Sequence, residues 1–349
     1  MQNKPKQTKL IVLGVAIAIL VVLNLVLTKY QLRILNLAGI YVVLGLSLNL
    51  INGFTGLFSL GHAGFMAIGA YTSALLTMSA AQKNANFFVE PLVPWLVAIE
   101  LPFLPALLIG GLVAAAIGAI LAAPILRLKD DYLAIATLGF SEIIRVVFTN
   151  TMSLTNGALG LKGLNAYTNM TYSWGIAIVT IVFMFSLRQS SYGKAFMAIR
   201  EDEVAAEAMG IDLFKHKLLA FTMGSFFAGV GGGLLAHLMQ TIDPLMFRFL
   251  MTFNVLLIVV LGGIGSISGT VIAAVVVTVA MEVLRFLDGP INLGFVVINS
   301  VAGMRMVLFS ILLMLVILFY QNGLMGRDEL SVAHVKKFLK WRPKKGAKP

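Results

Sequence analysis

The sequence of 349 residues contains no cysteine and only four histidines. Disulfide bonds, thiolate catalysis and zinc–thiolate sites are therefore excluded, and a histidine-rich metal site is not expected. Charged residues make up 12% of the chain, whereas soluble domains carry about 25%. With 59% hydrophobic residues and a mean hydropathy of +0.94, the chain is not a water-soluble globular protein, a disordered chain or a coiled coil. The composition indicates an all-α, polytopic membrane protein.

Long stretches without charge set the expected membrane spans, because a charged side chain near the middle of the bilayer is costly. Residues 34–82 contain no charge over 49 positions, and one helix of that length would be about 74 Å long, more than twice the hydrocarbon core. The chain must break there, and the charge-free residues 249–281 must break for the same reason. We expect about ten transmembrane helices, with broken helices near 53–64 and 262–269. Their expected ranges are 10–27, 34–51, 62–80, 103–126, 132–149, 173–187, 218–240, 247–265, 267–287 and 303–322.

Basic residues are distributed unevenly between the two sides that ten alternating spans define. Eighteen Lys and Arg residues fall on the side of both termini and the loop 188–217, five fall on the other side, and three lie inside spans. The positive-inside rule therefore predicts that both termini are cytoplasmic. We expect one transmembrane domain over residues 1–326, with a cytoplasmic loop at 188–217, and a basic cytoplasmic tail at 327–349.

The loop 188–217 contains a pattern typical of a short helix. Acidic residues occupy the first turn of the expected helix 201–209, where the helix dipole favours them, and Gly210 is suited to a left-handed C-terminal cap. A lone surface helix this short is marginal in water without a partner. Ala205 and Ala206 form a flat face suited to a groove in another protein; the alternative is an ordinary solvated loop helix.

The glycine run at residues 229–233 looks superficially like a nucleotide-binding loop. It lacks the Lys-Ser/Thr of a P-loop and falls inside an expected span, so we interpret it as a surface for close helix packing. The P-loop pattern is found nowhere in the sequence. If ATP drives this protein, another chain must bind it.

The most distinctive segment runs from Gly193 to Ile211 and includes Ala205-Ala206 followed, after three residues, by Gly210. Further distinctive segments are Gly56–Phe65, Gly69–Tyr71, Asp131–Phe140, Thr155–Gly157, Gly160-Leu161, Leu261–Ser266 and Gly323–Gly326. Over residues 35–326 the chain resembles LivM-type permeases of branched-chain amino acid ABC importers. It departs from the general ABC-importer motif at Val204, where that motif has Glu, and it lacks the motif's later Ile-x-Leu-Pro.

The resemblance implies a permease for branched-chain, hydrophobic amino acids that forms half of the translocation path and has no catalytic residue, metal or cofactor of its own. The implied partners are a LivH-type permease subunit, two cytoplasmic ATP-binding subunits, an extracytoplasmic solute-binding protein and the lipid bilayer of the cell membrane, but no nucleic acid. The loop residues expected to couple to the ATP-binding subunits are Glu201, Asp202, Glu203, Ala205, Ala206, Glu207, Ala208 and Gly210.

The expected helix breaks supply a hypothesis for the substrate path. A broken helix exposes backbone N–H and C=O groups at membrane depth, and a helix N-terminus there attracts a carboxylate, which suits an amino acid zwitterion. The alternative is tight packing around a kink, and a single buried histidine is more typical of a structural role. The candidate path residues are Gly53, Thr55, Gly56, Ser59, Gly61, His62, Gly64, Gly265, Ser266 and Ser268.

Two oppositely charged pairs fall inside expected spans. Glu142 and Arg145 are three residues apart on one helix face, and Glu282 and Arg285 repeat that spacing. We expect both to be buried ion pairs with structural roles, because pairing partly offsets the cost of burial.

Two rival transport functions and one enzymatic function stay open. The nearest rival is an ABC permease for urea or short amides. A proton- or ion-coupled secondary transporter finds its best support in Glu142, but the alanine-rich loop argues against it. An integral-membrane enzyme is not supported, because the expected spans hold no cluster of His, Asp and Glu.

Overall fold

The computed structural model describes residues 26–128 and 130–285 and, beyond these, residues 23, 24, 291, 292, 297, 298, 307, 310, 311, 314, 318, 323–326 and 329. Within this part of the chain nearly all regular structure is helical. The helices are α2 (Lys29–Asn49), η1 (Leu50–Phe54), α3 (His62–Thr77), α4 (Ala80–Asn86), α5 (Pro94–Val97), α6 (Phe103–Ile125), α7 (Asp130–Asn150), α8 (Met152–Thr155), η2 (Gly157–Leu159), α9 (Met170–Gln189), α10 (Ser191–Glu201), α11 (Glu203–Ala208), α12 (Leu213–Met239), η3 (Pro244–Phe247), α13 (Phe249–Gly262) and α14 (Ile267–Val283). Two short antiparallel ladders pair β1 (Leu161–Lys162) with β2 (Thr241–Ile242) and β3 (Ile291–Asn292) with β4 (Val297–Ile298).

Five helical segments are long and apolar enough to cross a membrane, at residues 29–54, 103–125, 132–150, 170–189 and 213–239. The shorter apolar helices α13 and α14 follow them, and α3 is separated from η1 by an irregular segment. The all-helical architecture and both helix breaks are therefore confirmed. The expected spans at 10–27 and 303–322 and the tail at 327–349 lie outside the described residues except for single positions, so the count of ten stays a prediction.

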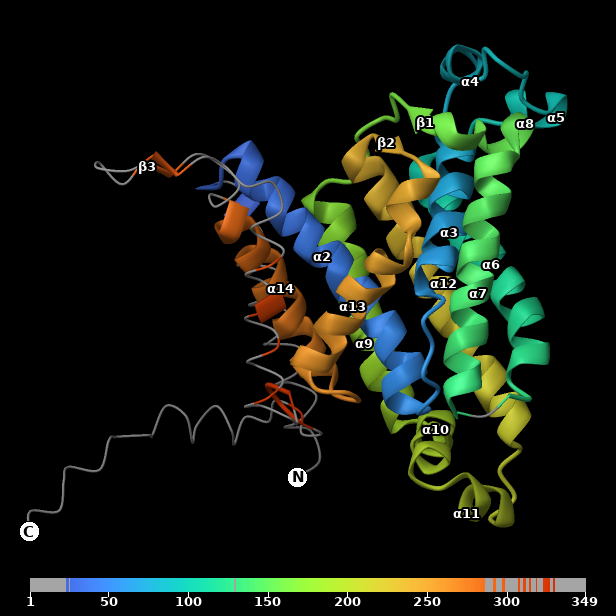
Figure 1. Ribbon diagram of the computed structural model, residues 1–349, viewed down its shortest axis with the longest axis vertical. Coiled ribbons are helices and arrows are strands. Elements are labelled where there is room, and N and C mark those ends of the chain that lie inside the picture. Colours follow the sequence, from blue (N-terminus) through green and yellow to red (C-terminus); the bar gives the residue numbers. More distant parts are fainter. Residues whose placement is uncertain are drawn as a thin grey trace, which may run out of the picture.

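Helix α12 lies at the centre of the bundle and packs along α3, α6 and α2 (Figure 1). Its glycines permit this close approach. A Cβ at Gly229 would meet the Cβ of Ala114 on α6 at 2.6 Å, and a Cβ at Gly233 would meet Leu107 Cδ1 on the same helix at 2.5 Å. The glycine run of α12 is thus a helix-packing surface, as expected for small residues within a membrane bundle.

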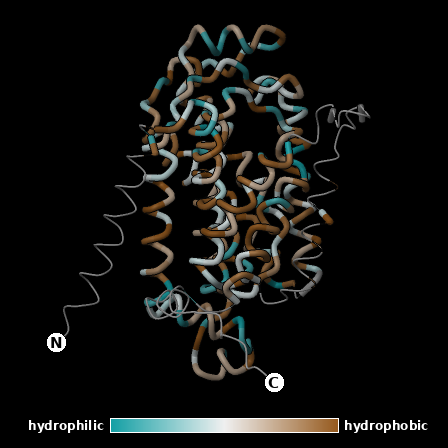
Figure 2. The backbone as a smooth tube through the Cα atoms, turned by 90° about the vertical axis from the view of Figure 1, so that its left-hand side faces the viewer, coloured by the Kyte–Doolittle hydropathy of each residue, from teal (hydrophilic) through white to brown (hydrophobic). Residues whose placement is uncertain are grey.

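The loops expected on opposite sides of the membrane lie at opposite ends of the molecule. The β1–β2 ladder, α4, α5 and α8 gather at one end, and α10 and α11 project from the other (Figure 1). The long helices between them are coloured mostly as hydrophobic, and hydrophilic positions are more frequent toward both ends (Figure 2). This arrangement matches a bundle whose middle lies in lipid.

Candidate functional site

The first helix break follows a π-helical turn and spans residues 55–61. Thr55 is the C-cap residue of η1, and its Oγ1 donates to the carbonyl of Ile51 within η1 at 2.6 Å. Gly56 then turns the chain with a φ of +72°, a conformation that favours glycine. Asn52 holds the irregular segment, because its Oδ1 accepts from the backbone N–H of Ser59 at 3.2 Å.

Helix α3 begins beyond this break without a side-chain cap of its own, because its N-cap residue is Gly61. Hydroxyl groups of other helices bind the backbone donors there. Leu60 N donates to Thr137 Oγ1 at 3.0 Å, and Ala63 N donates to Thr252 Oγ1 at 2.9 Å. The His62 ring is buried, with its Nε2 2.9 Å from Ser47 Oγ.

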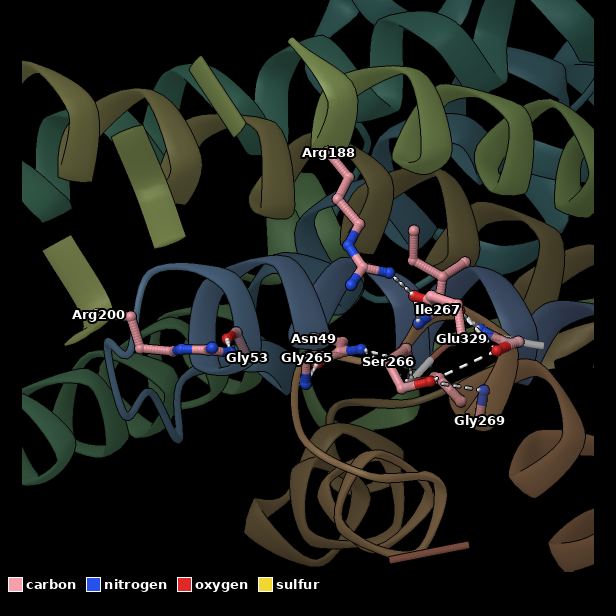
Figure 3. Close-up of polar contacts among 11 residues, drawn as sticks. Asn49, Gly53, Arg188, Arg200, Gly265, Ser266, Ile267, Gly269 and Glu329 are labelled. Atoms are coloured by element: carbon pink, nitrogen blue, oxygen red, sulfur yellow. Dashed lines mark hydrogen bonds and ion pairs between the residues drawn. The ribbon is translucent and has the colours of Figure 1, made fainter. Parts of the chain in front are cut away.

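The second break, at residues 263–266, separates α13 from α14 and uses charge as well as hydroxyl groups. Ser266 caps α14, with its Oγ accepting from Gly269 N at 3.1 Å. The carboxylate of Glu329 accepts from the backbone N–H groups of Ile267 and Ser268, each at 2.9 Å. Arg188, near the end of α9, pairs with the same carboxylate (Figure 3). The N-terminus of α14 therefore already holds a carboxylate.

The two breaks lie against each other (Figure 3). Asn49, at the end of α2, accepts from Gly265 N at 2.8 Å and donates to Ser266 O at 2.9 Å. Arg200, near the end of α10, donates from Nη1 to the carbonyl of Gly53 at 2.7 Å. A Cβ at Gly265 would lie 2.5 Å from that same Nη1. One side chain from the loop 188–217 thus touches both breaks.

The structure places the ten candidate path residues at these two breaks, in one region of the molecule. All are buried except exposed Gly56 and half-buried Ser268. Packing accounts for several glycines: a Cβ at Gly61 would meet the carbonyl oxygen of Thr137 at 2.7 Å, and one at Gly64 would meet Ser141 Cα at 3.1 Å. Hydroxyl groups of Thr55, Ser266 and Ser268 bond within the fold.

The loop 188–217 folds as two helices rather than the one expected. Asp202 separates α10 from α11, and its side chain caps α11 by accepting from Ala205 N at 3.0 Å. Gly210 adopts a φ of +84°, as expected for a residue that ends the helix in a left-handed conformation.

The expected alanine face of this loop is wrong in one respect. Ala205 is exposed, but Ala206 is only 4% exposed and packs within this chain. The exposed apolar side chains near it are instead Val204 (78%) and Met209 (83%). The short helix is anchored by the ion pair between Glu203 and Lys217 of α12. This ion pair holds the six-residue α11 against the start of α12.

Both expected charge pairs form, but neither is buried within this chain, and that part of the expectation is wrong. Arg145 Nε lies 2.7 Å from Glu142 Oε2, with side chains 21% and 39% exposed. Arg285 Nη1 lies 3.1 Å from Glu282 Oε1, and Tyr30 also donates to that carboxylate.

Two charged groups outside the spans have perturbed pKa values. Burial lowers the pKa of Lys83 on α4, whose Nζ donates to Leu96 O at 2.9 Å. The backbone N–H of Lys215 lowers the pKa of Asp212, the N-cap residue of α12. Among the described residues, no group of three or more His, Cys, Asp or Glu side chains could hold a metal ion.

Sequence reasoning missed Asn49, Arg188, Arg200 and Glu329 as members of the site. Their contacts join residues 62 to 217 positions apart, for which the sequence contains no local signal. Asn49 offered the one usable signal, because it is a strongly polar residue inside a charge-free stretch.

Comparisons with known proteins agree with the architecture. A family model described as the permease component of branched-chain amino acid transport systems matches residues 30–319. The high-affinity branched-chain amino acid transport system permease protein LivM of Escherichia coli K12 is 34% identical over 286 residues, covering 72% of this chain. The probable LivM permease of Methanocaldococcus jannaschii is 25% identical over 332 residues, 86% of this chain and 94% of that protein. The LivH permease of E. coli K12 is 25% identical over 314 residues, 85% and 94% of the two chains.

The match to E. coli LivM spans 63% of that protein, less than two thirds of its length. No solved structure gives a significant match to this chain.

Proposed function

Because this chain belongs to the family of permease components of branched-chain amino acid transport systems, we propose that it is the membrane permease subunit of an ATP-driven ABC importer for branched-chain amino acids. The observation that carries the proposal is the family match over residues 30–319 together with the two helices α10 and α11, which project from one end of the bundle (Figure 1). The sequence contains no P-loop, so the energy of ATP must enter through contact with another chain.

In this proposal the chain crosses the cell membrane ten times, with both termini, α10 and α11 on the cytoplasmic side. The excess of basic residues on that side supports the orientation. The chain would form half of the path, paired with a LivH-type permease, and would work with two ATP-binding subunits and an extracytoplasmic solute-binding protein. Residues 1–326 would form the permease domain and 327–349 a cytoplasmic tail.

We assign docking of the ATP-binding subunit to α11 and the residues beside it, 201–210. Their exposed apolar side chains support this, since large apolar groups at a polar end of the bundle are candidates for a protein contact. The exposed apolar residues of this surface are Val204, Ala205, Ala208 and Met209. The backbone hydrogen bonds of the six-residue α11 contribute little stability on their own. Its anchoring to α12 favours a role in transmitting force.

We place the substrate path at residues 53–64, which include the first break and in which Gly56 and Phe58 are exposed. A proton-coupled mechanism is less well supported, because Glu142 is already paired with Arg145 at 2.7 Å. Competition with urea separates this function from that of a permease for short amides.

Reconstitution tests the function. The chain, its permease partner, the ATP-binding subunits and the binding protein are placed in proteoliposomes, and uptake of radiolabelled leucine is measured. Uptake should require hydrolysable ATP and persist after the proton gradient is collapsed. Uptake that does not require ATP and is lost when the proton gradient is collapsed would show a secondary transporter instead. Competition by excess urea but not by valine would show an amide permease.

Substitution of Val204 by Glu tests the docking surface. A charge at this exposed apolar position should reduce co-purification of the ATP-binding subunit about tenfold, because it must be desolvated in the contact. Val89→Glu is the matched control, as Val89 is also exposed but lies in the loop between α4 and α5 at the opposite end. Equal co-purification of Val204→Glu and the wild type would place the contact elsewhere.

A further inference from the structure

Arg200 occupies the junction between the projecting helices and the membrane bundle. It is the penultimate residue of α10, two positions before the Asp202 cap that begins α11. Its side chain does not point to solvent but into the bundle, where it is 19% exposed. Nη1 donates to Gly53 O at 2.7 Å (Figure 3). Nη2 pairs with Glu201 at 2.7 Å.

The acceptor of this hydrogen bond is at a helix end. Gly53 lies in η1, the last turn of the α2–η1 helix, where backbone carbonyls lack partners within the helix and carry partial negative charge. A guanidinium is a strong partner for such a carbonyl, because a charged donor makes a stronger hydrogen bond than a neutral one. Arg200 therefore caps the membrane helix that leads into the first break.

Both breaks are built around the Arg200 side chain. A Cβ at Gly56 would lie 2.9 Å from Arg200 Cγ, and a Cβ at Gly265 would lie 2.5 Å from Nη1. Both glycines also have left-handed backbone conformations, with φ of +72° and +90°. Asn49 then bonds the first break's helix to Gly265 at 2.8 Å. The Arg200 side chain therefore lies directly against both breaks, and its displacement would change the packing at each.

We propose that Arg200 is the positioning residue through which movement of α10 and α11 reaches both helix breaks. The inference rests on the proposed docking of α11 to an ATP-binding subunit, and it adds the route by which that docking acts on the membrane helices. Among the described residues, the buried Nε of Arg200 has no hydrogen-bond partner. The guanidinium is therefore not fully satisfied here, and a shift of α10 breaks fewer bonds than a saturated contact would require.

The test compares Arg200→Gln and Arg200→Lys with the control Lys194→Gln, an exposed basic residue on the same helix. In the reconstituted complex, Arg200→Gln should keep the ATP-binding subunit bound and ATP hydrolysis near wild type. Leucine uptake per ATP hydrolysed should fall about tenfold, the change expected on losing a hydrogen bond to a charged donor. Arg200→Lys should recover part of the lost uptake per ATP hydrolysed. Unchanged uptake per ATP in Arg200→Gln, or a proportional fall of hydrolysis and uptake, would overturn the proposal.

A distance measurement tests the same role without transport. Because the sequence contains no cysteine, spin labels can be placed at Val204→Cys on α11 and Ile264→Cys in the second break, both exposed positions. In the chain with Arg200 intact the distance distribution should be narrow, and Arg200→Gln should broaden it while Lys194→Gln does not. Equal distributions would overturn the proposal. If the wild-type complex failed to bind or hydrolyse ATP, the docking proposal would be wrong. The spin-label distances would still show whether Arg200 holds α11 in place relative to the second break.

Discussion

The two helix breaks satisfy their exposed backbone in different ways. At the first, neutral hydroxyls of α7 and α13 bind the N–H groups at the start of α3, namely Thr137 at 3.0 Å and Thr252 at 2.9 Å. At the second, the start of α14 holds the carboxylate of Glu329, which Arg188 also binds. The first break thus depends on the packing of neighbouring helices, and the second depends on charge.

This difference bears on where a substrate could be recognised. A substrate carboxylate at the start of α14 would have to displace Glu329, whose contacts there are charge-assisted. At the start of α3 it would displace only hydroxyl groups, which are weaker partners for backbone N–H groups. Of the two breaks, we therefore favour the first as the place where an amino acid carboxylate is bound.

The largest effect is expected from adding a methyl group at the first break. A Cβ at Gly61 would lie 2.7 Å from the carbonyl oxygen of Thr137, and backbone cannot move aside as a flexible side chain can. Gly61→Ala should lower the free energy of unfolding by about 3 kcal/mol, measured as a fall in the melting temperature of the detergent-solubilised chain.

Gly139 is the matched control for this substitution. It lies on α7, the helix that Gly61 contacts, but a Cβ there would have no heavy atom within 4 Å. Gly139→Ala should therefore be neutral or stabilising, since alanine is the better helix former. Equal losses in the two variants would mean that close packing against α7 does not hold the first break.

A good part of this arrangement follows from the sequence, because a charge-free stretch longer than the bilayer must break and glycine marks the place. This rule predicted breaks near 53–64 and 262–269, and the structure has them at 55–61 and 263–266. The local signals for α11 also succeeded, since acidic first-turn residues and Gly210 act through the backbone of their own helix. The burial of Ala206 did not follow from them, because it depends on neighbours brought together by the fold.

The polar network between the breaks could not be predicted for the same reason. From its local sequence Arg200 is expected to be a charged residue of a cytoplasmic loop. The carbonyl that accepts its hydrogen bond, however, belongs to Gly53, 147 positions earlier. Glu329 reads as part of a basic tail, yet it binds the start of α14, 61 to 62 positions away. Such contacts are properties of the assembled bundle rather than of any window of sequence.

An intermediate effect is expected at the second break. Glu329→Ala removes the carboxylate from the start of α14 and should lower the free energy of unfolding by about 2 kcal/mol, the upper range for a helix cap with a charge near the helix dipole. A double-mutant cycle with Arg188→Gln, read from thermal unfolding, measures the coupling between the two side chains. Additive losses would show that Arg188 does not act through Glu329.

The smallest effect is expected from removing one neutral hydroxyl at the first break. Thr252 is fully buried on α13, and its Oγ1 accepts from Ala63 N at 2.9 Å. Thr252→Val keeps the shape but leaves that N–H without its acceptor, so the free energy of unfolding should fall by about 1 kcal/mol, and Thr252→Ser should restore it in part. Thr278→Val is the control, because among the described residues the Thr278 hydroxyl only bonds back to Ala274 O of its own helix and its loss strands no donor. If Thr252→Val were no less stable than Thr278→Val, the hydroxyl would not be what holds the start of α3, and the contrast between a packed and a charged break would rest on glycine contacts alone.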